Sequence, residues 1–207
     1  ASGIKVYMVE KKPGIGGVMA MLDKTFPTND CSMCILAPRL VEVGRHKDIE
    51  LFTLTDILQV KGEPGNYKVI LRKNPRYVIE ELCTGCGECV RICPVGKIKE
   101  AKEDAKLKPI PDEFNMGLSN RPAIYIMYPQ VIPNKAVIDR ENCIYFQTGK
   151  CKACVKVCPR GAIDFEQKEE IIEIDVGAII LAPGYEIFDP SVKEDLGYGK
   201  YPNVITS

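Results

Sequence analysis

Eight of the ten cysteines fall into two runs with nearly the same spacing, and this feature constrains the chain more than any other. The first run, residues 83–94, has the form Cys-x2-Cys-x2-Cys-x3-Cys-Pro. The second run, residues 143–159, ends in the same Cys-x2-Cys-x3-Cys-Pro spacing, but seven residues instead of two separate its first two cysteines. Two related runs of this kind predict two linked metal-binding sites.

The first run has the ligand spacing of bacterial two-cluster ferredoxins. In those proteins three cysteines of a run hold one 4Fe–4S cluster and the fourth cysteine reaches the other cluster. The spacing therefore predicts two cross-ligated 4Fe–4S clusters and a protein that transfers electrons. The predicted sets are Cys83, Cys86, Cys89 and Cys158 for one cluster, and Cys93, Cys143, Cys151 and Cys154 for the other.

Two other uses of cysteine are less favoured. Disulfide frameworks are typical of short secreted chains, whereas this chain has 207 residues and shows no signal-peptide pattern. Zinc also binds Cys-x2-Cys pairs, but it requires neither the third cysteine two residues on nor the proline after the fourth. Exposed thiolate clusters indicate a reducing compartment, so we expect a cytoplasmic location.

Composition excludes several classes of partner. The chain carries 28 basic and 28 acidic residues, so its formal net charge is zero. Neither an excess of positive charge nor a polybasic stretch indicates binding to nucleic acid or to a membrane surface. No apolar run approaches the roughly 18 residues that a membrane span needs. The hydrophobic content of 45% suits a globular protein with one domain and a smaller second one.

The N-terminal part predicts alternating strand and helix. Residues 4–9 are rich in β-branched side chains and predict a strand that ends at Glu10. A glycine-rich turn at residues 11–17 precedes a short helical stretch over 18–23. Residues 34–43 place apolar side chains on one face and predict a helix.

A three-stranded β-meander is predicted around the cysteine runs. Residues 49–60 and 67–72 predict two strands joined by a turn, and the third strand, residues 171–176, comes only after the second cysteine run. It leads into residues 177–184, which predict a buried, parallel-type strand followed by a tight turn.

This order predicts an insertion into the meander. Insertions are tolerated at hairpin ends because the host's chain ends already lie close together there. We expect a first domain part at residues 1–74, an inserted two-cluster ferredoxin at 75–168, and the continuation of the first domain at 169–207. Residues 96–134 are rich in Lys, Glu and Pro, and predict a surface excursion without chemistry.

A strand that ends in an acidic residue is half of a dinucleotide-binding fold, in which the acid binds a ribose hydroxyl. Glu10 fits this place, but no Gly-x-Gly-x-x-Gly precedes it, and Glu10 on its own favours an ordinary solvated residue at a strand end. Gly16 and Gly17 follow at a spacing that lets the backbone approach a diphosphate. With the meander and the strand at 177–184, they predict an incomplete FAD-binding domain of the Rossmann type.

Four segments together resemble the A subunit of heterodisulfide reductase: residues 22–46, 75–78, 143–151 and 177–190. The resemblance covers essentially the whole chain. It implies an α/β fold, namely a thioredoxin-reductase-like FAD-binding domain with an inserted α+β ferredoxin. Proteins of this family are much longer, so the resemblance implies a partial chain.

The resemblance also implies a biological setting. Members of this family work in anaerobic, multi-subunit complexes, in which the flavin splits electron pairs between two acceptors (electron bifurcation). The implied partners are iron–sulfur subunits and an electron-donating hydrogenase or dehydrogenase.

Carried over to this sequence, the resemblance implies a set of FAD contacts. Glu10, with Lys11 beside it, would bind the adenosine ribose, and Gly16 and Gly17 would lie against the diphosphate. The backbone near Ile57 would meet the adenine. The flavin end is assigned to Ala182 and Gly184, whereas Pro183 departs from the Ala-Thr-Gly common in this fold.

The remaining two cysteines, Cys31 and Cys34, form a separate Cys-x2-Cys at the start of the predicted helix 34–43. The helix dipole would acidify a thiol there. The spacing favours half of a third 4Fe–4S cluster. A redox-active disulfide beside the flavin and a pair of buried thiols are the alternatives.

Three functions therefore stay open. The first is that of an oxidoreductase subunit, dependent on flavin and iron–sulfur clusters, which exchanges electrons between FAD and the clusters. The second is a non-catalytic role in electron relay and docking, of the ferredoxin type. The third is a flavin-dependent disulfide reductase that uses Cys31 and Cys34. FAD content separates the first from the second.

Overall fold

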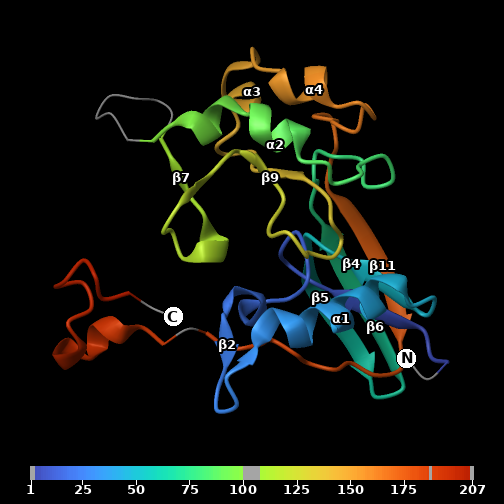
Figure 1. The fold of residues 1–207 in the computed structure, drawn as a ribbon. Helices are drawn as coiled ribbons and strands as arrows, with labels where there is room; N and C mark the ends of the chain where they lie inside the picture. The colour runs from blue at the N-terminus through green and yellow to red at the C-terminus, as the bar shows by residue number, and fades with distance from the viewer. Residues whose placement is uncertain (1–2, 100–107, 187, 206–207) are drawn as a thin grey trace.

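The computed structural model describes residues 3–99, 108–186 and 188–205. Its N-terminal part is a βαβ unit (Figure 1). Strand β1 (Val6–Val9) pairs in parallel with β4 (Ile49–Phe52), and helix α1 (Ser32–Arg45) connects them and packs on β4. A parallel pair needs such a crossover because its two strands run in the same direction.

Two short elements precede α1, a 3-10 helix η1 (Val18–Met21) and the hairpin of β2 (Lys24–Thr25) with β3 (Asp30–Cys31). Helix α1 begins two residues before the predicted start. Cys31 is its N-cap, and the Cys31 sulfur accepts a hydrogen bond from the Cys34 backbone N–H at 3.2 Å. This bond satisfies one of the N–H groups that the first turn leaves without a helical partner.

The strand predicted at residues 49–60 is in fact two strands, so that prediction was wrong. Leu54 has a φ of 54°, and this left-handed conformation turns the chain between β4 and β5 (Thr55–Glu63). Strand β4 belongs to the parallel pair, whereas β5 belongs to the meander. The turn at Leu54 changes the direction of the backbone between the two sheets. A single extended strand could therefore not pair in both of them.

The predicted meander is confirmed. Strand β6 (Asn66–Lys73) pairs antiparallel with β5 on one side and with β11 (Glu170–Val176) on the other. A bulge lies between Ile57 and Gln59 of β5. Because Lys73 is opposite Glu170, the chain leaves the sheet and returns to it at one place. This pairing agrees with an insertion, while the boundaries 1–74, 75–168 and 169–207 stay a prediction.

The segment between these two strands, which we call the cysteine block, has a core of its own. It contains three short helices, α2 (Glu88–Ile92), α3 (Ile144–Thr148) and α4 (Ala153–Val157), together with the 3-10 helix η2 (Pro94–Lys97). Helix α2 packs on α4. The core includes Val78, Val95, Ile124 and Ala162, each at most 3% exposed.

The expected surface excursion at residues 96–134 was wrong for residues 108–134, which form most of its described part. It contains the antiparallel pair of β7 (Ile110–Pro111) with β8 (Asn120–Arg121), the 3-10 helix η3 (Glu113–Asn115), and β9 (Ile124–Tyr125), which pairs with β10 (Val137–Ile138). Apolar residues of this Lys-, Glu- and Pro-rich segment are buried in the hydrophobic cores of both the cysteine block and the N-terminal unit. Residues 100–107 of the expected excursion lie outside the described residues.

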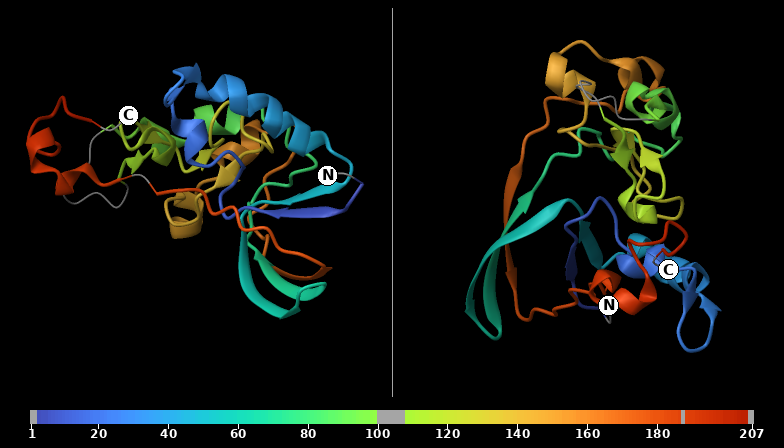
Figure 2. Two further views of the ribbon diagram at one scale, coloured as in Figure 1. Left: turned by 90° about the horizontal axis from the view of Figure 1, so that it is seen from below. Right: turned by 90° about the vertical axis from the view of Figure 1, so that its left-hand side faces the viewer.

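The buried strand predicted at residues 177–184 is also absent from the described structure. Ile180 is 92% exposed and Leu181 is 83% exposed. An apolar strand of the parallel type needs neighbouring strands, and among the described residues the β1–β4 sheet has only two strands and does not pair with this segment. Beyond it, η4 (Pro190–Val192) and η5 (Glu194–Leu196) extend away from the meander and the cysteine block (Figure 2).

The longest described helix, α1, has 14 residues, and none of the described helices combines the length and the apolar character that crossing a membrane requires.

Candidate iron–sulfur sites

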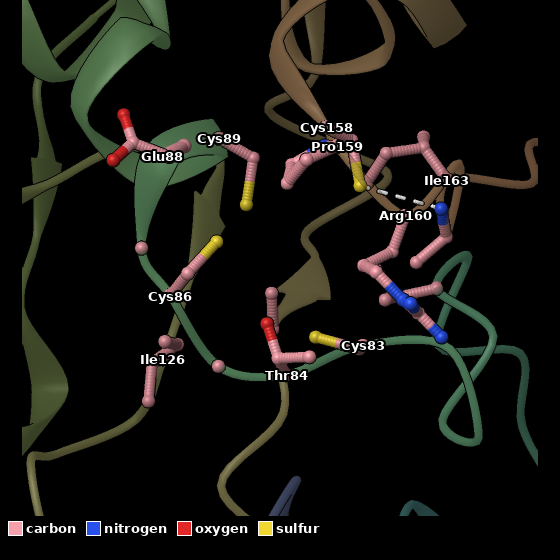
Figure 3. Close-up of a pocket in the computed structure, with 15 residues that line it drawn as sticks. Cys83, Thr84, Cys86, Glu88, Cys89, Ile126, Cys158, Pro159, Arg160 and Ile163 are labelled. Carbon is pink, nitrogen blue, oxygen red and sulfur yellow. Dashed lines mark hydrogen bonds between the residues drawn. The ribbon is translucent and has the colours of Figure 1, made fainter.

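Four cysteines from the two runs line one cavity, which we call site I. Cys83 and Cys86 come from the loop that leads into α2, Cys89 lies within α2, and Cys158 follows α4. The cavity encloses about 380 Å³, including its open mouth. The four sulfur atoms point toward the space between the two segments (Figure 3). The Cys158 sulfur also accepts a hydrogen bond from the Ala162 backbone N–H at 3.3 Å.

The other four cysteines line a second cavity of about 350 Å³, which we call site II. Cys93 follows α2, Cys143 precedes α3, and Cys151 and Cys154 lie before and within α4. The structure thus gathers the eight cysteines into the same two sets that the spacing predicts. Their role as iron ligands stays a proposal.

The packing of α2 on α4 explains this exchange of ligands. Cys89 and Cys93 are four residues apart in the first run, and so are Cys154 and Cys158 in the second. In each pair the first cysteine lies within its helix and the second follows the helix end, so the two face different sites. Each helix therefore contributes one cysteine to site I and one to site II.

The donor set fits 4Fe–4S clusters, whose ligands are cysteine thiolates. Burial raises the pKa of Cys89 to about 12 and that of Cys154 to about 11, and neighbouring cysteines add to both shifts. Burial also raises the pKa of Cys143. Such thiols do not ionise by themselves at neutral pH, whereas a bound metal deprotonates its thiol ligands.

The sulfur atoms surround a space instead of converging on one point. Within residues 3–99, 108–186 and 188–205, no three metal-ligating side chains lie close enough together to hold a single metal ion. Four thiols around a cavity are the arrangement that a multi-atom cluster requires, since its ligands bind separate iron atoms at its corners.

The two sites differ in their surroundings. Thr84, Glu88 and Arg160 line site I, and Cys86 is exposed. Among the described residues, those that line site II include no charged one. Around it stand the aromatic rings of Tyr145 and Phe165, which stack with centroids 3.9 Å apart.

The residues expected to contact FAD fall into two groups. Glu10 directly follows β1, and its carboxylate accepts a hydrogen bond from the Lys12 backbone N–H at 2.8 Å. The Glu10 carbonyl accepts one from the Thr55 N–H at 3.0 Å, so Glu10, Lys11 and the start of β5, which carries Ile57, adjoin one another. Gly17, with a φ of 56°, has open space where a side chain would stand.

Gly16 has a structural role that the sequence did not predict. A Cβ atom at Gly16 would lie 2.3 Å from the hydroxyl oxygen of Tyr128, a residue of the cysteine block. Tyr128 donates a hydrogen bond to the Ile15 carbonyl, and the Ile15 N–H bonds the Ile132 carbonyl at 2.9 Å. Glycine is therefore needed here for the close approach of Tyr128, and its predicted diphosphate contact is untested.

Ala182 and Gly184 belong to the second group. They lie in the exposed segment after β11, and among the described residues no hydrogen bond ties positions 178–184 to β1 or to the glycine-rich turn. The described structure does not bring them together with Glu10.

Cys31 and Cys34 form a disulfide in the structure, with Cα atoms 5.2 Å apart. This arrangement matches the alternative expectation and differs from the favoured half-cluster. Three-residue spacing at a helix start brings the two sulfurs together, because residues i and i+3 share one helix face. Iron binding by the reduced pair stays a prediction.

Sequence reasoning missed three polar residues around these sites. Arg76 is buried and donates hydrogen bonds to the Pro13 carbonyl and the Thr53 hydroxyl, both at 2.7 Å. Lys135 donates to the Cys83 carbonyl at 2.6 Å, and Tyr128 bonds Ile15. No motif marks these residues, because their partners are distant in sequence.

Comparison with known proteins agrees with this description. The family model "4Fe-4S dicluster domain" matches residues 82–162, which contain both sites. The match supports a ferredoxin-type domain with two 4Fe–4S sites in this part of the chain.

The chain as a whole is similar to a segment of larger proteins. The A subunit of the H(2):CoB-CoM heterodisulfide,ferredoxin reductase of Methanothermobacter marburgensis is 49% identical over 204 residues, 99% of this chain. The iron-sulfur A subunit of the CoB–CoM heterodisulfide reductase of Methanocaldococcus jannaschii is 46% identical over 205 residues, again 99% of the chain. The chain spans 28% of the length of each. The resemblance to the A subunit of heterodisulfide reductase is therefore confirmed over nearly the whole chain.

Proposed function

We propose that this chain is the electron-transferring part of an oxidoreductase subunit of the heterodisulfide reductase type, and that it passes electrons between FAD and two 4Fe–4S clusters. The observation that carries the proposal is the sorting of eight cysteines into two cavities of four. Site I would hold one cluster through Cys83, Cys86, Cys89 and Cys158, and site II the other through Cys93, Cys143, Cys151 and Cys154.

When bound, such clusters exchange single electrons, and a flavin exchanges electrons singly or in pairs. The protein's contribution is to hold the two sites side by side. Since α2 and α4 each supply a cysteine to both sites, no rearrangement can separate the two sites without unpacking these helices. The apolar core around them, including Val78 and Val95, excludes water from the space between.

The flavin part of the proposal is supported by the N-terminal βαβ unit. We propose that Glu10 and Lys11 bind the ribose end of FAD, that Gly16 and Gly17 adjoin its diphosphate, and that Ile57 lies near the adenine. The parallel pairing of β1 with β4 and the open backbone at Gly17 support these roles. Ala182 and Gly184 would approach the flavin end, which requires the segment after β11 to lie closer to β1.

The names of the relatives support two further parts of the proposal. The name of the Methanothermobacter marburgensis protein contains H(2), CoB-CoM heterodisulfide and ferredoxin. The Methanosarcina acetivorans relative, 41% identical, is named for ferredoxin or F(420)H(2). We propose that this chain works in a cytoplasmic, anaerobic complex with other iron–sulfur subunits and a hydrogenase or dehydrogenase, and that electrons are split between two acceptors there.

Iron, sulfide and flavin analysis tests the proposal. The anaerobically purified chain should bind about eight iron and eight sulfide, as two 4Fe–4S clusters require. Zinc, or a total near four iron, would overturn the cluster assignment. For FAD, E10A should weaken binding by about 1.5–3 kcal/mol, the range for hydrogen bonds to a charged group. The iron content should not change. Clusters without any FAD binding would favour the relay function instead.

A second candidate function rests on the disulfide between Cys31 and Cys34. A flavin beside it would make the chain a disulfide reductase. Thiol titration before and after anaerobic reduction of the flavin decides this point, because only a coupled disulfide releases two thiols when the flavin is reduced. The C31S/C34S variant serves as the control that cannot release them. If the unreduced protein already shows two iron-bound thiolates at these positions, the half-cluster interpretation is correct.

A further inference from the structure

Lys135 is a basic residue that contacts the ligand loop of site I. Its ammonium group is half-buried and donates a hydrogen bond to the backbone carbonyl of Cys83, at 2.6 Å. Lys135 forms no ion pair with a carboxylate of the described residues. Its positive charge therefore acts on site I without a local acid to offset it.

Two other features of site I act in the same direction. Arg160 lines the cavity beside Cys158 (Figure 3), while the one acidic lining residue, Glu88, is ion-paired with Arg91. Cys86 is exposed to solvent. Positive charge and solvent exposure both stabilise the more negative, reduced form of an iron–sulfur cluster.

The surroundings of site II are apolar, in contrast to the charged and solvent-exposed surroundings of site I. The described residues that line it are cysteines and apolar residues, including Val95, Ile138 and Phe165, and none of them is charged. Two of its cysteines, Cys93 and Cys143, are buried. An added electron is therefore less well stabilised there, since a low-dielectric environment disfavours extra charge.

The segment that carries Lys135 also joins site I to the glycine-rich turn. The Ile132 carbonyl accepts a hydrogen bond from the Ile15 backbone N–H. Two residues later Asn134 lies against the ligand loop, since a Cβ atom at Gly85 would be 2.6 Å from the Asn134 carbonyl oxygen. Residues 132–134 join these two contacts, and three residues span at most roughly 10 Å. Site I is therefore the cluster site adjacent to the glycine-rich turn.

We propose that Lys135 holds the reduction potential of site I above that of site II, so that a chain carrying one extra electron keeps it in site I, beside the glycine-rich turn. The proposal rests on the proposed function. One electron enters from a one-electron donor, no bond forms or breaks, and no proton is transferred. Lys135 acts as a positioning residue, because its ammonium group stabilises the added negative charge without receiving the electron.

The experiment is an EPR-monitored titration of the cluster-loaded chain with dithionite. The variants C86S and C151S, each altering the ligands of one site, assign the two signals. In the unmodified chain the signal of site I should appear first. In K135M the ratio of electrons in site I to those in site II should fall by on the order of tenfold, or about 59 mV for a one-electron couple.

Two variants make the result specific. K135R keeps the charge and should retain the original ratio. K61M removes the same charge from β5 of the meander, an element that contributes no residue to either site, and should also leave the ratio unchanged. Iron content and circular dichroism show whether K135M is folded and loaded. If it is not, K135Q replaces it, and the order of reduction in the unmodified chain still tests the proposal.

The proposal is overturned if site II is reduced first in the unmodified chain, or if a loaded K135M keeps the original ratio. Failure of the proposed function gives a different result, because the chain would then bind no pair of 4Fe–4S clusters and neither signal would appear.

Discussion

The cysteine block and the N-terminal βαβ unit differ in how they bury the residues of their candidate sites. The block supplies all of its site residues, since all eight cysteines come from its own two runs and six of them belong to or pack against one core. The βαβ unit has a two-stranded sheet, and the apolar segment expected to extend it is exposed at Ile180 and Leu181. A site made by two short runs is complete within a short chain, whereas a dinucleotide site depends on a wide sheet.

The two regions nevertheless share an interface. Tyr128 and Val131 of the block are buried in one cluster with Ile15, Ala20 and Leu40 of the N-terminal unit. Figure 1 shows the block above this unit, with the meander strands reaching up to it. The interface fixes the position of site I relative to the glycine-rich turn, which electron transfer between them would require.

The largest expected effect tests whether the block's sites are cross-ligated. C158S changes the second run, but it should remove or alter the cluster of site I, with a loss of up to about four of eight iron. Its EPR spectrum should resemble that of C86S and differ from that of C154S. C31S/C34S is the control and should keep all the iron of sites I and II. A C158S spectrum that matches C154S would show that each run ligates its own cluster.

The next largest effect is the loss of unfolding free energy when a buried ion pair is removed, compared with an exposed one. Arg121 is 8% exposed in its side chain and pairs with Glu113 and Asp139 inside the block. R121M should lower the free energy of unfolding by about 3 kcal/mol, because it leaves the largely buried Asp139 carboxylate without its partner. K68M, which removes an exposed pair with Glu173 in the meander, should change it little. Denaturant unfolding of the cluster-loaded protein measures both, and equal losses would contradict the contrast.

A smaller effect tests the interface between the regions. Y128F removes the hydrogen bond to the Ile15 carbonyl and should cost about 1 kcal/mol. G16A should cost more than about 1 kcal/mol, because Gly16 has a φ of 131° and the new methyl group would meet the Tyr128 hydroxyl. In the double variant the two costs should not add, since the hydroxyl that obstructs the methyl group is gone. Strict additivity would show that the two residues are not in contact.

The smallest effect is a pH dependence. A hydrogen bond from Arg121 lowers the pKa of Glu113. Because the folded-state pKa lies below the unfolded value of about 4.3, the pair stabilises the fold above that pH and the gain is lost as the pH falls further. The Glu113 side chain is 68% exposed, so the change should stay below about 1 kcal/mol. Unfolding of E113Q, followed as the pH falls from about 5 to about 3, should lack this component; an identical acid slope would contradict it.

Several parts of the molecule were predictable because their signals are local. The spacing of Cys83, Cys86 and Cys89 indicates one site, and the β-branched run at 171–176 indicates a strand of the meander. Other parts were not predictable. The Lys- and Pro-rich composition of residues 108–134 conceals Ile110, Ala123 and Tyr128, which are buried through contacts with distant elements. Composition averages over such residues, whereas burial is decided one side chain at a time.

By itself the sequence determined the two cysteine sets, because ligand spacing is a property of neighbouring residues and the geometry of a cluster leaves few ways to satisfy it. It also determined the meander, and the strand pairing agrees with the predicted insertion. Only the tertiary structure decided that Leu54 divides one predicted strand into two, that residues 177–184 pair with no strand of the described chain, and that Gly16 accommodates Tyr128. It also placed Lys135 on the Cys83 carbonyl. Each of these depends on a partner far away in the sequence, and only the folded chain brings such partners together.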